Sequence, residues 1–228
     1  MASGRCHRAM LRRGTTSSRG AATVEFHIVA LFALLPLCMG ALQMALLMVE
    51  NHHLDHAAFM AARHGAVSHG DMGQVRRAYA KAATPLFVGA GSGVDSRNAV
   101  ERVTRAYAFA TADIAAFARI RLLSPTAAAA EDFSIGRDGA RVIPNDALEY
   151  RSNVRGTKSG VSIQRANVLR VEFVYCRPLI VPFAGALLSG VLRRLDPDPW
   201  HQSCYAADRV PLRSEGVAPM QSDFRVIS

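Results

Sequence analysis

Acidic residues are scarce in this chain, which has 18 aspartates and glutamates against 27 lysines and arginines in 228 residues. The first 20 residues contain no acid at all. They hold five arginines, which supply more than half of the net charge of +9: Arg5, Arg8, Arg12, Arg13 and Arg19. Because the basic charge is concentrated at one end of the chain, a nucleic-acid partner is not expected.

Catalytic signatures are also missing. The chain has no His-Glu-x-x-His, no Gly-x-Ser-x-Gly, no Walker sequence and no Cys-x-x-Cys. The glycine-rich stretch at residues 89–93 lacks the Gly-Lys-Ser/Thr ending of a phosphate-binding loop and is typical of a flexible connection. We therefore expect neither an enzyme nor a bound cofactor, although separated Asp, His and Ser side chains could still converge in the fold.

Charge disappears entirely between Phe26 and Val49. A helix of these 24 residues would be roughly 36 Å long, which is enough to cross a hydrocarbon core of about 30 Å. The alternatives are a buried core helix and a secretory signal that is cut off after the run. Ordinary globular helices are rarely apolar on every face for this length. The apolar core of a secretory signal, about 7–15 residues, is shorter than this run, and no small-x-small cleavage site follows the run.

The charges on either side of the run set its expected orientation. Arginines precede it, and Glu50 and Asp55 follow it, which predicts a cytoplasmic N-terminus and an extracytoplasmic C-terminal part. The length suits one domain plus a membrane segment. The expected parts are a basic leader (1–20), a transmembrane and extended helix (21–70, with the span at about 26–49) and an α+β domain (71–228).

Glu25 is the anomaly at the start of the run, because a carboxylate beside an apolar span is disfavoured. A basic leader that ends in Gly20, followed by an apolar helix with glutamate at its fifth position, is the layout of a prepilin. In that layout a prepilin peptidase would cut between Gly20 and Ala21. The new ammonium group of Ala21 could then pair with Glu25 of a neighbouring subunit. The alternative is that Glu25 is an acid at the headgroup boundary, favourably placed against the helix dipole.

A wider pattern surrounds this junction and covers about the first 70 residues. Ala22, Val24, Glu25 and Phe26 form an Ala-x-Val-Glu-Phe start, Pro36 lies within the span, and residues 56–66 contain Ala-Ala-x-x-x-Ala-Arg-x-Gly-Ala. In these residues the chain resembles the TadE-like family of tight-adherence pili. A weaker likeness occurs at 168–175, 182–183 and 210–222, and residues 85–165 show none.

The resemblance implies a processed minor pilin, or pseudopilin, that helps to assemble an adhesive filament without catalysis of its own. Glu25 and Phe26 would be assembly contacts, and Gly20 and Ala21 would form the processing site. The implied partners are the membrane, a prepilin peptidase, other pilin and pseudopilin subunits, and the tight-adherence assembly machinery.

Beyond the span the pattern predicts helices first and an antiparallel sheet later, an α+β fold. A stripe of small residues at helical spacing runs through Leu54, Ala57, Ala58, Ala61 and Ala62. Such a stripe lets helices approach closely and suits a pilus bundle, or equally packing against the chain's own domain.

Further helices are expected at 74–83 and at 97–122, the latter capped by Asp95 or Ser96 and ended by Ser124-Pro125. Strands are expected at 133–135, 140–143, 147–154, 161–163, 169–176 and 205–212. The apolar stretch 179–192 is too short for a second crossing and contains Pro182. We expect a packed or surface-lying helix there, and a membrane-touching role stays open.

Topology separates the four cysteines. Cys6 lies in the leader and Cys38 in the span, so only Cys176 and Cys204 are expected outside the cytoplasm. We therefore predict a disulfide between these two, with a pair of free buried thiols as the alternative.

Histidines cluster after the span, and His52 and His56 have the i, i+4 spacing that can hold a metal on one helix face. No third ligand is fixed by spacing, and histidines near lipid headgroups explain the cluster equally well. We therefore predict no metal site among the five histidines: His52, His53, His56, His64 and His69.

These features together predict a single-pass protein of the bacterial inner membrane, cleaved after Gly20 and incorporated into a surface pilus. The alternative is an uncleaved single-pass envelope protein whose extracytoplasmic domain binds a ligand or partner and in which Glu25 is incidental.

Overall fold

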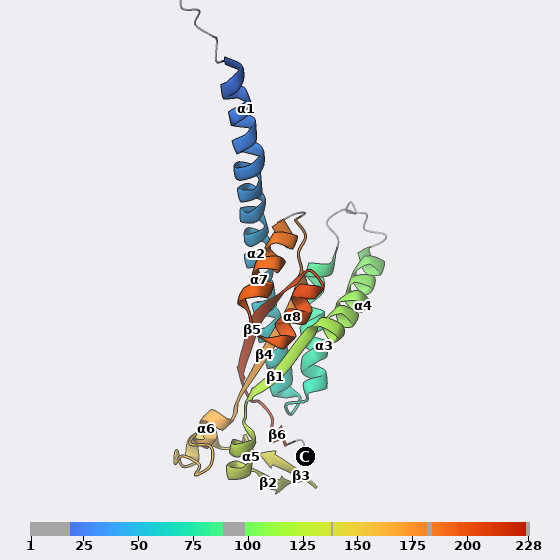
Figure 1. The fold of residues 1–228 in the computed structure, drawn as a ribbon. Helices are drawn as coiled ribbons and strands as arrows, with labels where there is room; N and C mark the ends of the chain where they lie inside the picture. Colours follow the sequence, from blue (N-terminus) through green and yellow to red (C-terminus); the bar gives the residue numbers. More distant parts are fainter. Residues whose placement is uncertain (1–18, 89–98, 138, 182–183, 227–228) are drawn as a thin grey trace, which may run out of the picture.

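The computed structural model describes residues 19–88, 99–137, 139–181 and 184–226. Its most prominent feature is one continuous N-terminal helix that projects beyond a mixed helical and β-sheet domain (Figure 1). This helix consists of α1 (Arg19–Val29), a π-helical turn η1 (Ala30–Leu34) and α2 (Leu35–Val67). The α+β fold with a long apolar N-terminal helix confirms the predicted fold class.

The helix continues through Pro36, which lies at the start of α2 directly after the π-helical turn. A proline inside a regular α-helix removes a backbone hydrogen bond and clashes with the carbonyl four residues earlier. Here the preceding turn is already widened, because the Leu35 N–H donates to the carbonyl of Ala30, five residues before it. The proline therefore does not end the helix.

A three-stranded antiparallel sheet forms the centre of the domain, in the order β1 (Ala118–Ser124), β4 (Val168–Pro178) and β5 (Arg209–Pro219). β4 and β5 pair along their whole length. Every second side chain of β4 is fully buried on one face of the sheet, namely those of Leu169, Val171, Phe173 and Tyr175. The strand predicted at 169–176 is thus confirmed.

The C-terminal half of α2 packs against this sheet, with α3 (Met72–Ala83) beside it (Figure 1). The stripe of small residues is fully buried in the resulting core. At Gly216 of β5 the approach is so close that an added Cβ would lie 2.0 Å from the carbonyl oxygen of Ala58. On the same face of the sheet, the ring of Tyr79 in α3 stacks on Phe173 at 4.1 Å. The small residues therefore serve the domain's own core.

The remaining elements surround this core. The helical ones are η2 (Thr84–Phe87), α4 (Ala99–Phe117), α5 (Ala127–Phe133), η4 (Leu148–Tyr150), α6 (Ile163–Ala166), α7 (Ala184–Leu195) and α8 (Pro199–Ala206). A second antiparallel sheet has the order β2 (Ile135–Arg137), β3 (Ala140–Ile143) and β6 (Phe224–Arg225).

The predicted helix at 97–122 is wrong in its last part, because α4 ends at Phe117 and β1 follows at once. Ile120 and Leu122 of β1 lie opposite Phe173 and Val171 of β4. Pairing with β4 therefore makes residues 118–124 a strand. The apolar residues of this segment also have helical spacing, so the sequence alone does not reveal the strand. Asp95 and Ser96, the expected caps, lie outside the described residues, as do the loop at 89–93 and the pair 182–183.

Several predicted strands are also wrong. The strand predicted at 133–135 is displaced, because Phe133 is the last residue of α5 and β2 begins at Ile135. The stretch 147–154 contains only the short helix η4, and 161–163 leads into α6. The strand predicted at 140–143 is confirmed as β3. The final strand begins at Arg209 rather than at 205 and runs on to Pro219. Helix α8 occupies the first residues of the strand predicted at 205–212, and the side chain of Asp198 caps this helix by accepting from two backbone N–H groups.

The contact at Gly216 yields a direct test. Replacing Gly216 by alanine should push β5 away from α2 and destabilise the domain by about 1–3 kcal/mol, the usual cost of overpacking. The control is Gly190→Ala in α7, where an added Cβ meets nothing within 4 Å and alanine is the better helix former. Thermal unfolding of the full chain in detergent, followed by circular dichroism, should show a lower Tm only for Gly216→Ala. Equal Tm values for the two variants would contradict the close helix–sheet contact.

A candidate assembly surface on the N-terminal helix

The N-terminal helix has two environments along its length. Between Thr23 and Leu42 nearly all of its side chains are exposed, including Phe26, Phe32 and Leu37 at 67%, 74% and 70%. From Gln43 onward one face of the helix is buried against the domain. A contiguous apolar surface of this size is not stable in water and requires lipid or protein around it.

Two polar contacts mark the change between these environments. The side chain of Gln43, only 2% exposed, accepts a hydrogen bond from the backbone N–H of Val181 at 2.8 Å. Seven residues further on, Glu50 pairs with Arg177 of β4 at 2.8 Å, and both side chains are almost completely buried. The domain therefore begins at Gln43, inside the span of 26–49 that the sequence predicted.

Arg177 is held tightly at this junction. It also donates to the carbonyl of Leu86, and its guanidinium lies 5.3 Å from the centre of the Phe87 ring. Burial acts to lower the pKa of Arg177, but the hydrogen bond and the charge of Glu50 outweigh burial and hold this pKa above its ordinary value. Arg177 therefore keeps its positive charge at this junction.

The predicted processing and assembly residues lie at the far end of the helix. Gly20 and Ala21 belong to the first turn of α1, which begins at Arg19. Glu25 and Phe26 follow one turn later, and both are exposed. Within the described part of the chain, Glu25 has no ion-pair partner. Its carboxylate is thus presented on the helix surface beside exposed apolar side chains.

Within the described ranges, the helix Thr23–Val67 is the one that is long and apolar enough to cross a membrane. Residues 20–63 match the model of a family described as TadE-like protein. The N-terminal segment is TadE-like. This match confirms the resemblance seen in the sequence, and TadE-like segments suggest a pilin-like protein of tight-adherence pili. No curated protein and no solved structure matches the chain.

The TadE-like segment includes both environments of the helix. It begins at the Gly20 junction, continues through the exposed apolar part and ends at Arg63, within the part of α2 that is packed in the domain core. The weaker likeness near the C-terminus lies outside the match. There, the backbone N–H of Gln221 and the hydroxyl of Ser222 both donate to the carbonyl of Ala66. These residues fasten the C-terminal segment to the end of α2.

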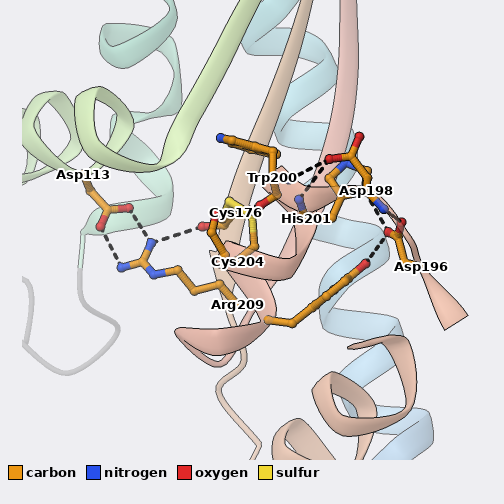
Figure 2. Close-up of a disulfide and its surroundings, with 10 residues drawn as sticks. Asp113, Cys176, Asp196, Asp198, Trp200, His201, Cys204 and Arg209 are labelled. Atoms are coloured by element: carbon orange, nitrogen blue, oxygen red, sulfur yellow. Dashed lines mark hydrogen bonds and ion pairs between the residues drawn. A yellow bond between two sulfur atoms is a disulfide. The ribbon is translucent and has the colours of Figure 1, made fainter. Parts of the chain in front are cut away.

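A disulfide joins Cys176 of β4 to Cys204 of α8, the pair that the sequence predicted (Figure 2). Beside it, Arg209 donates to both carboxylate oxygens of Asp113, at 2.8 and 3.0 Å, and to the carbonyl of Cys176. The same guanidinium lies 3.7 Å from the centre of the Phe117 ring. The disulfide thus connects α8 to the sheet, and the ion pair connects the sheet to α4. No signal in the sequence indicates the ion pair.

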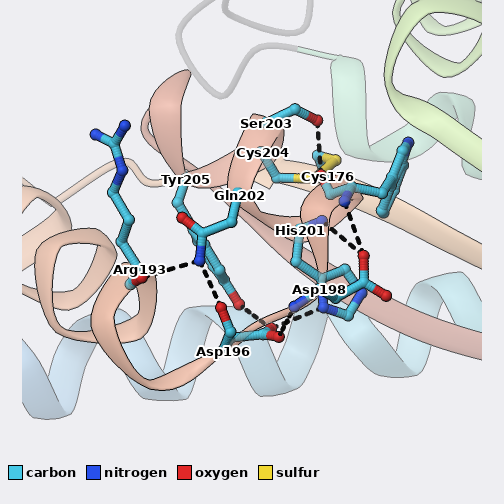
Figure 3. Close-up of polar contacts among 10 residues, drawn as sticks. Cys176, Arg193, Asp196, Asp198, His201, Gln202, Ser203, Cys204 and Tyr205 are labelled. Carbon is cyan, nitrogen blue, oxygen red and sulfur yellow. Dashed lines mark hydrogen bonds and ion pairs between the residues drawn. A yellow bond between two sulfur atoms is a disulfide. The ribbon is translucent and has the colours of Figure 1, made fainter.

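Asp196 organises the junction between α7 and α8 (Figure 3). Its carboxylate accepts from the Tyr205 hydroxyl at 2.8 Å and contacts Nδ1 of His201 at 2.7 Å. Hydrogen bonds from the backbone of Asp198 and from Tyr205 lower the pKa of Asp196 below its ordinary value. Gln202 of α8 in turn donates to the carbonyl of Arg193 in α7. These bonds fix the end of α7 on α8, and the disulfide fixes α8 on the sheet.

The histidines after the span lie in two places in the structure. His52, His53 and His56 are exposed on α2, whereas Nδ1 of His69 contacts the carbonyl of Asp223. In the described part of the chain, no group of three or more His, Cys, Asp or Glu side chains is arranged to hold a metal ion.

The buried ion pair at the junction predicts a large mutational effect. Glu50→Gln leaves the charge of Arg177 buried without a counter-charge, and such a loss costs about 3–5 kcal/mol. The matched control is Glu101→Gln, which removes a pair with Arg105 whose side chains are 69% and 80% exposed and should cost less than about 1 kcal/mol. Denaturant unfolding in detergent measures both. A loss for Glu50→Gln no greater than that for the control would show that the pair is not buried in the membrane-anchored protein.

Proposed function

We propose that this chain is a minor pilin, or pseudopilin, made as a precursor, cut between Gly20 and Ala21 by a prepilin peptidase, and assembled into a tight-adherence pilus. The observation that carries the proposal is the family match, which begins at Gly20 and includes an exposed Glu25 at the fifth position after it. The role is structural rather than catalytic, in keeping with the matched family.

The position of the bond that would be cut supports this reading. A peptidase needs an extended substrate, and the first turn of a helix is the least costly turn to unwind because its N–H groups have no partners within the helix. Gly20 lies in that turn of α1 and places no side chain beside the bond. The leader before it carries arginines and no acid, which favours retention on the cytoplasmic side of the membrane.

Assembly would use the part of the helix that the domain leaves uncovered. After cleavage, the ammonium group of Ala21 lies at the tip of an exposed apolar helix, and Glu25 has no partner among the described ion pairs. Two opposite charges at 4 Å attract by about 4 kcal/mol at an effective dielectric constant of 20. A contact between Ala21 of one subunit and Glu25 of its neighbour would therefore guide the helices into register. The small-residue stripe plays no part, because it lies in the domain core.

The disulfide supports an extracytoplasmic domain. Disulfides persist in oxidising compartments and are rare in the cytosol, and Cys176 and Cys204 both belong to the domain that follows the membrane helix. With the arginine-rich leader in the cytoplasm, the helix would cross the inner membrane once and place the domain outside.

N-terminal processing tests the proposal. The full chain is expressed with and without a prepilin peptidase, and its mass and N-terminal sequence are determined. We expect a peptidase-dependent start at Ala21 that Gly20→Arg abolishes and that the control Gly14→Arg, in the same leader, leaves unchanged. Glu25→Gln should be cleaved normally but enter filaments at least tenfold less. An intact N-terminus in every sample would favour an uncleaved single-pass envelope protein whose outer domain binds a partner.

A further inference from the structure

α7 exposes large apolar side chains, although a polar side chain lies on its buried side. Its exposed face carries Leu187, Val191 and Leu195, which are 71%, 49% and 73% exposed. Its buried face carries Ser189, whose hydroxyl hydrogen-bonds to the carboxylate of Asp208. A helix on a soluble surface turns its apolar stripe inward and its polar residues toward solvent. The outer face of α7 is therefore suited to an apolar environment.

The two junction contacts place α7 relative to the membrane helix. Gln43 holds Val181, just before α7, and Glu50 holds Arg177. These two levels on α2 are seven residues apart, which corresponds to about 10 Å along the helix axis. If Glu50 marks the membrane boundary, the start of α7 lies about 10 Å inside it, the upper end of the depth at which interfacial amphipathic helices are found.

Packing agrees with this placement. α7 lies alongside α2 (Figure 1). An apolar groove of about 650 Å³ between the two helices is lined by Leu31, Leu35 and Met39 from the uncovered part of the N-terminal helix and by Leu187 and Val191 from α7. The exposed surface of α7 is thus continuous with the surface of the membrane helix.

The charged residues of α7 lie at its C-terminal end, where the level of Glu50 would place the membrane boundary. The helix has no charged residue from Ala184 to Leu192 and then two exposed arginines, Arg193 and Arg194, at the end nearer the domain. Arginines at the edge of an apolar helix extend toward the headgroups, where anionic lipids attract them.

The attachment of α7 is rigid at both ends. Gln43 fixes the chain before it, while Gln202 and the Asp196 network fix its C-terminal end to the disulfide-bonded α8 (Figure 3). A mobile helix could turn its apolar face inward, but α7 is held in place with that face outward.

We propose that α7 lies in the bilayer leaflet on the domain's side, with Leu187 and Val191 among the acyl chains and Arg193 and Arg194 at the headgroups. This inference rests on the membrane anchoring included in the proposed function. The domain would then contact lipid itself, and the protein would be held at a fixed tilt and depth before it enters a filament.

Fluorophore quenching in liposomes tests the placement. The full chain carries Cys6→Ser and Cys38→Ser, so that one introduced cysteine bears an environment-sensitive fluorophore while the disulfide stays oxidised. Three positions of nearly equal exposure are compared: Leu37→Cys in the membrane helix, Leu187→Cys in α7 and Val154→Cys before α6, which are 70%, 71% and 72% exposed. The vesicles contain phosphatidylcholine and phosphatidylglycerol. Quenchers are lipids brominated on the acyl chain, at shallow or deep positions, and aqueous iodide.

The expected pattern is at least twofold quenching by brominated lipid at positions 37 and 187, with protection from iodide, and the reverse at position 154. Position 187 should respond more to shallow bromine and position 37 more to deep bromine. If position 187 behaves like position 154 while position 37 is lipid-quenched, the inference fails and the anchoring stands. Shielding of position 187 from both quenchers would assign its surface to a second copy of the chain and also overturn the inference. If position 37 is not lipid-quenched, membrane anchoring itself fails.

Discussion

The close approach of α2 to β5 is the constraint on which the rest of the structure depends. Gly216 lies so near the carbonyl of Ala58 that any side chain at 216 would have to displace backbone. The alanines of α2 allow this approach, and together with Leu54 they bury one face of the helix against the sheet and α3. Because the same helix continues outward as an apolar rod, the domain is fixed to the membrane segment without a flexible linker.

The two halves of the N-terminal helix therefore differ in what they contact. Its C-terminal half supplies the core, and its N-terminal half, before Gln43, supplies the surface available to lipid or to neighbouring subunits. The polar groups at the division are paired: Gln43 with the backbone of Val181, and Glu50 with Arg177. The N-terminal helix and the domain are thus joined directly, by a continuous helix and by two polar contacts.

How far the sequence predicts this structure differs between elements. The charge-free run, the apolar residues at every second position of β4 and the positions of the cysteines relative to the run can all be read from the sequence, and the long apolar helix, the strand and the disulfide predicted from them agree with the structure. The stripe of small residues left two environments open, because close packing requires the same residues in a pilus bundle and in a core. Only the contact with Gly216 decides between them.

Other features depend on partners far away in the chain. β1 becomes a strand because β4, about 50 residues later, pairs with it, although its apolar residues also fit a helical period. The two polar contacts at the junction join residues 138 and 127 positions apart, and no local signal in the sequence indicates them. Of the candidate site, Glu25 and Phe26 are exposed, and their role as assembly contacts stays a prediction. The boundary at Gln43 required the structure.

Hydrogen exchange of the full chain in lipid nanodiscs, measured at increasing denaturant, tests most directly whether one helix is shared by membrane and core. The account predicts that the amides of residues 54–66 in α2 lose protection together with those of residues 168–178 in β4, as one cooperative unit, while the amides of residues 26–40 stay protected by the bilayer. If residues 54–66 remain protected after β4 has exchanged, α2 is an independent rod and the account is wrong.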